Sequence, residues 1–170
     1  YIPHDMTIYE ECSKLPASSY LEFDVSQPFA KIEKSVQYWD ALTGFNDKFK
    51  GRYDEAIEEF LFLLDDATRL RLVADVPVGV FLSGGIDSSL VASSVQKIAP
   101  GQIKAFSVKF EQADFDESEV AKNTAAQLNI DLEVLKLGKA ELSRQLEKIP
   151  IHYDEPFSDS SQIPTLAISE

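Results

Sequence analysis

The amino-acid sequence predicts an α/β protein, in which a parallel sheet carries helices on both of its faces. Short apolar runs at residues 78–82, 103–110 and 132–137 are expected to be strands, and they alternate with helix-like segments. Because the links between them are short, this alternation is typical of βαβ units rather than of separate sheet and helix domains. The run at 78–82 is apolar at every position, which is the pattern of a parallel strand buried on both faces.

Residues 1–50 differ from the rest of the chain, because prolines and serines break them into short extended pieces. Polar and apolar side chains alternate over residues 20–25, as in a half-buried strand. Residues 26–50 show only weak periodicity and are expected to form a connector. We therefore expect an extended linker segment at 1–50, unable to bury much apolar surface alone, followed by the α/β domain at 51–170.

The first helix of that domain is expected from Tyr53, where apolar residues recur at three- and four-residue steps up to Leu70. Acidic side chains occupy its first turns and two arginines its end, which complements the helix dipole. Further helices are expected at 87–99, 116–128, 140–149 and 164–170. Pro100 and Gly101 stop the second helix, and Asp116 with Glu119 has the spacing of a capping box that opens the third.

Composition excludes several classes of function. The 170 residues include 16 basic and 29 acidic ones, for a net charge of −13, which disfavours binding to nucleic acid or to anionic membranes. Cys12 is the only cysteine, so an internal disulfide framework and a thiolate zinc site are both excluded. Neither a membrane-spanning run nor a signal peptide is found, so we expect a soluble, cytoplasmic protein.

The residues that indicate chemistry are Ser-Gly-Gly-Ile-Asp-Ser-Ser at 83–89, directly after the first predicted strand of the α/β domain. In open α/β sheets, ligands bind where a strand ends in a loop that opens a helix. Two glycines let the backbone approach a ligand closely, and the amides and dipole of the helix N-terminus favour a phosphate. Three serine hydroxyls add further hydrogen-bond donors.

Asp87 is out of place beside phosphates unless a divalent cation such as Mg²⁺ bridges the two. The loop is neither a Walker A motif nor a dinucleotide-binding glycine fingerprint. From these residues alone, a strand-to-helix turn with a capping Asp87 or Ser88 remains the alternative to a phosphate site.

The loop resembles the pyrophosphate-binding loop of the N-type ATP pyrophosphatases, and residues 75–89 are similar to the same region of the glutamine-hydrolysing asparagine synthetases. Residues 153–161, Tyr-Asp-Glu-Pro-Phe-Ser-Asp-Ser-Ser, and Ile-Pro-Thr at 163–165 also resemble this family. So do three pieces near the N-terminus, which resemble the end of the family's glutaminase domain and its linker: 1–3, 14–16 and 38–40.

The resemblance implies a Rossmann-like PP-loop fold and an enzyme that activates the aspartate side chain with ATP and Mg²⁺. A β-aspartyl-AMP intermediate forms with release of pyrophosphate, and ammonia derived from glutamine then displaces AMP. Asp87 is the implied metal ligand, and a homodimer is implied for the full-length enzyme. The residues implied to bind the nucleotide are Leu82, Ser83, Gly84, Gly85, Asp87, Ser88, Ser89 and Val108, with Leu82 and Val108 lining the adenine pocket.

Two parts of the family pattern are not found in these residues. One is the cysteine that starts the glutaminase, a role that Cys12 does not match, and the other is a second nucleotide loop expected after residue 170. We therefore expect a piece of a longer protein, with 1–50 ending the glutaminase domain and 51–170 beginning the synthetase domain. This piece alone is expected to lack synthetase activity.

Several alternatives stay open at this point. The enzyme could act on another carboxylate, as related amidotransferases and β-lactam synthetases do, or the chain could be a non-catalytic nucleotide-binding module. The carboxylates of Asp154, Glu155 and Asp159 could serve acid–base chemistry or a metal. They are expected more simply as helix caps and solvated loop charges.

Overall fold

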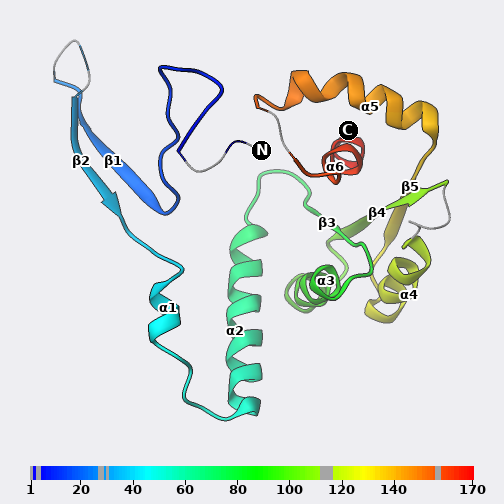
Figure 1. Ribbon diagram of the computed structural model, residues 1–170. Coiled ribbons are helices and arrows are strands. Elements are labelled where there is room, and N and C mark those ends of the chain that lie inside the picture. The colour runs from blue at the N-terminus through cyan, green and yellow to red at the C-terminus, as the bar shows by residue number, and fades with distance from the viewer. Residues whose placement is uncertain (1, 3–4, 27–28, 30, 112–116, 156–157) are drawn as a thin grey trace. The chain divides into compact units, whose positions relative to one another are not determined.

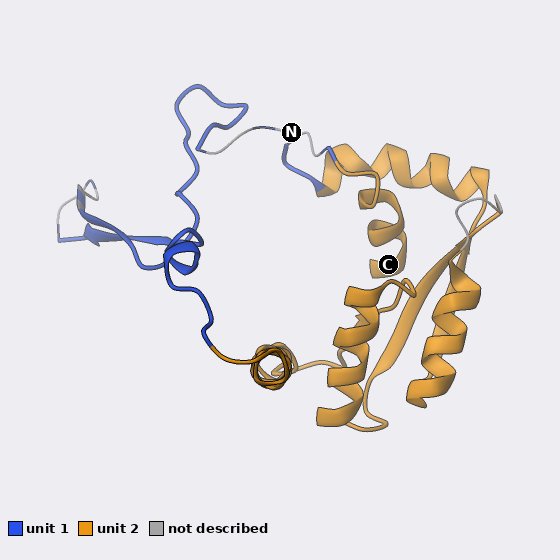
Figure 2. Cartoon of the chain, turned by 60° about the horizontal axis from the view of Figure 1, so that its bottom comes forward, with its two compact units in different colours: residues 1–50, 153–158 blue, residues 51–152, 159–170 orange. Residues whose placement is uncertain are grey.

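The computed structural model describes residues 2, 5–26, 29, 31–111, 117–155 and 158–170. The chain forms two compact units (Figure 2). Unit 1 comprises residues 1–50 and 153–158, and unit 2 comprises residues 51–152 and 159–170. No helix in the described part of the chain is long and apolar enough to cross a membrane.

Unit 1 is built around an antiparallel pair of strands, β1 (Ser19–Asp24) and β2 (Lys31–Gln37), followed by the single-turn helix α1 (Thr43–Asn46). The expected strand at 20–25 is confirmed, but the expectation of a connector throughout 26–50 is wrong, because β2 lies within it. Apolar residues recur only twice along β2, so its periodicity is weak, and pairing with β1 makes it a strand. None of the residues described in unit 1 is buried, which agrees with the expectation that this segment buries little surface.

Unit 2 opens with α2 (Tyr53–Arg71), the long helix predicted from its apolar spacing. Its first turn is fixed by the Glu55 carboxylate, which accepts a hydrogen bond of 2.7 Å from the Arg52 backbone N–H. A second contact joins α2 to the next helix of the unit, since Asp65 accepts hydrogen bonds from Ser94 Oγ and Lys97 Nζ.

A three-stranded parallel sheet follows, formed by β3 (Gly79–Phe81), β4 (Lys104–Phe110) and β5 (Leu132–Leu137) in the order β3-β4-β5. The α/β class and the three predicted strands are confirmed. Ladder hydrogen bonds of 2.8 Å from Leu82 N to Phe106 O and from Ala105 N to Asp131 O continue the pairing past the strand ends.

Helices cover both faces of this sheet, as the sequence predicts (Figure 1). The helices of unit 2 beyond α2 are α3 (Ile86–Ile98), α4 (Ser118–Leu128), α5 (Lys139–His152) and α6 (Gln162–Ser169). On one face, Ala105 of β4 is buried with Ala92 of α3 and Ala121 of α4, whose small side chains let the helices pack close to the strands. On the other face, α6 packs against β4, and α5 packs against α6.

Three details differ from the sequence-based expectations. Val80 of β3 is buried but Phe81 is 51% exposed, so this strand is buried on one face only. The helix α4 begins at Ser118 without a side-chain cap, and Glu119 pairs instead with Lys122; Asp116 of the expected capping box lies outside the described residues. The helix α5 continues past Pro150, where the sequence suggested that it would stop.

Candidate functional site

The glycine-rich loop joins the end of β3 to the start of α3 and turns sharply at its two glycines. Gly84 has a φ of +86°, a backbone conformation that side-chain-bearing residues rarely adopt. A Cβ at this position would lie 2.9 Å from the Cβ of Val120 on α4 and 3.0 Å from the backbone N of Ala121. Gly84 is therefore required both by the turn and by the close packing of α4 behind it.

Gly85 is the N-cap of α3, with extended φ and ψ of −70° and 162°. The first intrahelical bond of α3 runs from Ser89 N to Gly85 O at 3.0 Å. The amides of residues 86–88 precede that bond and have no acceptor within the helix. A glycine N-cap also has no side-chain oxygen to accept from them, so these amides are available to an anion at the positive end of the helix dipole.

The serine hydroxyls of the loop are held in a local network. Ser83 Oγ and Ser88 Oγ lie 3.0 Å apart, and Ser83 Oγ accepts a hydrogen bond of 3.3 Å from Gly85 N. Ser88 Oγ and Ser89 Oγ both donate to the Gly85 carbonyl, at 3.1 and 2.8 Å. This network fixes the shape of the loop and places three hydroxyl groups around the helix N-terminus.

A cavity of about 210 Å³ begins where the loop leaves β3. Leu82, Ser83 and Val108 of β4 are among the residues that line it. Leu82 is 1% exposed, so its side chain belongs both to the core and to the cavity wall. The cavity places a mostly apolar space next to a polar loop, an arrangement that suits a ligand with a flat apolar group and an anionic tail.

Asp87 lies in the first turn of α3 with an exposed carboxylate. Among the residues that the structure describes, no group of three or more histidine, cysteine, aspartate or glutamate side chains is placed to hold a metal ion. A single carboxylate beside free amides and hydroxyls nevertheless fits Mg²⁺, which proteins bind through one or two carboxylates together with substrate phosphates.

The structure brings three of the eight sequence-predicted residues, Leu82, Ser83 and Val108, into one cavity. The other five, Gly84, Gly85, Asp87, Ser88 and Ser89, follow along the loop and into the first turn of α3.

Two of the three carboxylates noted at 154–159, those of Glu155 and Asp159, make structural contacts. Glu155 pairs with Lys14 Nζ at 2.5 Å and accepts from Ile8 N at 3.2 Å, and Lys14 holds the pKa of Glu155 below its ordinary value. Asp159 Oδ1 accepts a hydrogen bond of 2.8 Å from Ser161 N just before α6, which lowers the pKa of Asp159. These contacts support the interpretation of Glu155 and Asp159 as loop-stabilising residues, whereas the expected helix cap is not found, because the N-cap of α6 is Ser161 and no side chain caps this helix.

Sequence reasoning missed the lining residues that α6 contributes to the cavity, which are Pro164, Thr165 and Ile168. Residues 163–165 stood out only through the family resemblance. The four-residue spacing of Pro164 and Ile168 indicates that they share one helix face, and this was the signal in the sequence that could have pointed to them. Phe110 and Glu117 also line the cavity and were not predicted.

Comparison with known proteins gives a family for most of unit 2. Residues 59–170 match the asparagine synthase family. The chain is 39% identical over 150 residues to asparagine synthetase [glutamine-hydrolyzing] 1 of Bacillus subtilis, covering 82% of the chain and 24% of that protein. It is 32% identical over 181 residues to the amidase chry2 of Gibberella zeae, covering 96% of the chain and 26% of that protein. The chain thus spans about a quarter of the length of these relatives.

Among solved structures, the chain is similar to an ammonia-dependent NAD synthetase from Campylobacter jejuni. The identity is 18% and the TM-score 0.46, over 65% of this chain and 46% of that one.

Proposed function

Because the chain belongs to the asparagine synthase family, we propose that it is part of an ATP-dependent synthetase that converts the side chain of aspartate to an amide. This proposal rests on one observation: an apolar cavity and a polar loop meet at the end of β3. An apolar cavity lined by Leu82 and Val108 is continuous, through Ser83, with a loop whose amides and hydroxyls suit phosphate groups. ATP needs both of these features, because it joins a flat base to a polyanion.

We assign the adenine end of ATP to the cavity and its β- and γ-phosphates to the loop. The amides at the start of α3 and the hydroxyls of Ser83, Ser88 and Ser89 would bind the phosphate oxygens. Asp87 would hold Mg²⁺, which when bound neutralises the charge that gathers on the leaving pyrophosphate. Donors fixed around that charge lower the barrier because they need no reorganisation as it develops.

The reaction proposed for the whole protein proceeds in two steps. A carboxylate oxygen of aspartate attacks the α-phosphorus, the bond from that phosphorus to the bridging oxygen breaks, and pyrophosphate leaves. Ammonia then attacks the β-carbonyl carbon of the resulting aspartyl-AMP, and AMP departs with the bond electrons. In this proposal residues 51–170 form the first half of the synthetase domain, and residues 1–50 form the end of a glutaminase domain with its linker.

The test uses the whole protein encoded by the reading frame that contains these residues. It is incubated with ATP, Mg²⁺, aspartate and ammonia, and the nucleotide products are separated. We expect AMP and pyrophosphate, dependent on aspartate and lost in Asp87→Ala. Asp131→Ala removes an exposed aspartate just before β5 and should keep activity. ADP and phosphate as products, or full activity in Asp87→Ala, would contradict the proposal.

A second candidate keeps the chemistry and changes the acceptor, because the relatives include an amidase at 32% identity as well as an asparagine synthetase. The same assay distinguishes the two. AMP that forms only with another carboxylate would assign this chain to a sister activity with the same nucleotide site.

A further inference from the structure

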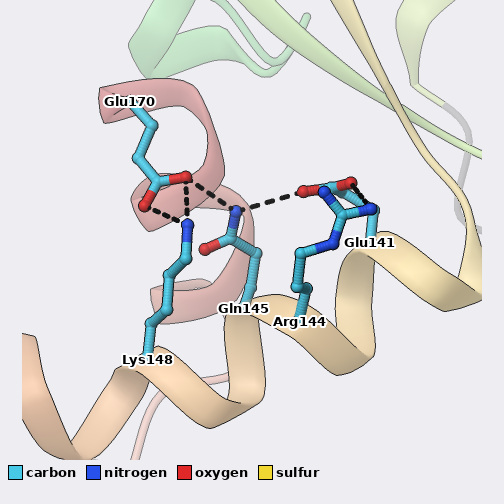
Figure 3. A network of polar contacts seen from close by, with 5 residues as sticks. All are labelled: Glu141, Arg144, Gln145, Lys148 and Glu170. Atoms are coloured by element: carbon cyan, nitrogen blue, oxygen red, sulfur yellow. Dashed lines mark hydrogen bonds and ion pairs between the residues drawn. The ribbon is translucent and has the colours of Figure 1, made fainter.

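We propose that a polar cluster between α5 and α6 positions α6 as a wall of the nucleotide cavity. We call this cluster the α5–α6 clamp; it consists of Gln145 and Lys148 on α5 and of Glu170 at the end of α6 (Figure 3). The inference rests on the proposed function, because it concerns how the cavity holds the base of ATP.

The clamp is a bidentate contact supported by a buried amide. Lys148 Nζ lies 2.5 Å from Glu170 Oε1 and 2.6 Å from Glu170 Oε2, so one ammonium group holds both carboxylate oxygens. Gln145 Nε2 donates to Glu170 Oε2 at 3.2 Å. Gln145 and Lys148 are three positions apart and therefore project from the same face of α5.

Gln145 is expected to lower the stability of the fold compared with an apolar residue at the same position. Its side chain is 1% exposed, and its Oε1 is buried without a hydrogen-bond partner in the described part of the chain. Turning the amide over would aim Oε1 at the carboxylates of Glu141 and Glu170, so the observed orientation is fixed. An unpaired buried carbonyl destabilises the fold, and leucine would pack here without it. The amide therefore serves to orient Glu170 rather than to add stability.

Gln145 and Lys148 lie on α5, whereas Glu170 directly follows Ser169 of α6. Their contacts therefore tie the two helices together, and the ammonium group of Lys148 neutralises the carboxylate that Gln145 helps to orient.

The position of α6 matters because one of its faces lines the cavity. Pro164, Thr165 and Ile168 face Leu82 and Val108 across a space of about 210 Å³. Leu166 and Ala167, on other faces of α6, are buried. A shift of α6 away from α5 would therefore change the width of the space assigned to the base.

The experiment compares Lys148→Met with Arg144→Met in the whole protein. Arg144 lies on the same helix and carries the same charge, but its ion pair, at 3.1 Å, is with Glu141 of α5 and not with α6 (Figure 3). The measurements are the dissociation constant for Mg-ATP, the KM for ATP and for the carboxylate substrate, and hydrogen exchange of the α6 amides.

We expect Lys148→Met to weaken ATP binding about fivefold or more and to speed exchange in α6, while the KM for the carboxylate stays unchanged. Arg144→Met should match the wild type in all three. The double reversal Lys148→Glu with Glu170→Lys should restore part of the ATP binding, because it remakes the ion pair with opposite polarity but loses the hydrogen bond from Gln145. Gln145→Leu should weaken ATP binding without lowering the unfolding midpoint, a combination that a merely structural role would not produce.

The outcomes separate the clamp from the proposed function. If the wild type forms AMP but Lys148→Met binds ATP as the wild type does, the clamp has no positioning role and the function stands. Faster exchange in α6 with unchanged ATP affinity also overturns the inference. If the wild type binds ATP but forms no AMP with any carboxylate, the function fails, and the ATP affinities still decide the clamp. A wild type that binds no ATP would overturn both.

Discussion

Gly84→Ala is the substitution whose effect the structure specifies most closely. The residue would have to hold a φ of +86°, which costs an L-residue about 1–2 kcal/mol. Its Cβ would also lie 2.9 Å from both Cβ and Cγ1 of Val120 and 3.0 Å from the backbone N of Ala121. Because a backbone atom cannot rotate away, α4 or the loop must shift, at a cost of about 1–3 kcal/mol like that of overpacked cores.

We therefore expect Gly84→Ala to lower the free energy of unfolding by about 3 kcal/mol. Gly85→Ala is the matched control, since its φ is −70° and its Cβ would meet Ser83 Oγ at an ordinary 3.5 Å. The control should cost no more than about 1 kcal/mol, the scale of a poorer N-cap. The methyl group of Gly85→Ala would instead occupy space needed by a bound phosphate, so the main effect of this substitution should be weaker ATP binding.

Urea unfolding followed by far-UV circular dichroism measures the first effect, and titration with Mg-ATP measures the second. Adding Val120→Ala to Gly84→Ala removes one of the two clashing side-chain atoms and should recover part of the lost stability, but not the part due to φ. Equal unfolding free energies for Gly84→Ala and Gly85→Ala would refute the reasoning, since backbone conformation and packing distinguish only the first position.

Three further predictions follow from burial, charge and cavity shape. Leu137→Ala should lower the unfolding free energy by about 3 kcal/mol because Leu137 is 1% exposed, whereas Leu135→Ala on the same strand, 37% exposed, should cost far less; equal losses in urea would contradict this. Hydrogen bonds from Lys97 and, to a lesser degree, from Ser94 lower the pKa of Asp65 in the folded protein. The ionised carboxylate therefore stabilises the fold at pH values above the pKa that Asp65 has in the unfolded chain. That contribution is lost as the pH falls through the folded pKa, and Asp65→Asn should give a flatter acid branch in a plot of urea midpoint against pH. Val108→Trp should fill the cavity and weaken ATP binding with little change in the urea midpoint, because Val108 is only half-buried.

The parts of the fold that the sequence predicted are those in which the local pattern and the tertiary environment agree. The strand β5 was predicted with its observed bounds because it is short, largely apolar and set between two helical segments. The strand β2 was missed because five of its seven residues are polar, and its partner β1 provides the pairing that local propensity does not. Pro150 did not end α5, although proline disfavours the helical conformation in the residue before it.

In the candidate site, too, the part with a local sequence pattern was predictable and the part formed by tertiary packing was not. The loop at 83–89 could be found because its glycines and serines are contiguous and their chemistry is local. The cavity wall on α6 could not, since Thr165 reaches Leu82 through tertiary packing across more than eighty positions of sequence. No periodicity within α6 specifies which strand it will cross. The clamp residues are hidden for the same reason, because Lys148 and Glu170 look like ordinary surface charges until α5 and α6 are packed together.

The internal bonding of the loop has a consequence for how it would bind phosphate. Ser83 Oγ and Ser88 Oγ already bond to each other and to the backbone, so a ligand exchanges hydrogen bonds there rather than adding new ones. The gain in binding free energy at these hydroxyls is then small, and their contribution is to hold the loop ready, which lowers the entropy lost on binding. The free amides at the start of α3 have no competing partner within the helix, and Asp87 is exposed. Affinity for a polyphosphate should therefore depend chiefly on these amides and on a cation at Asp87, while the serines determine the geometry in which they meet the ligand.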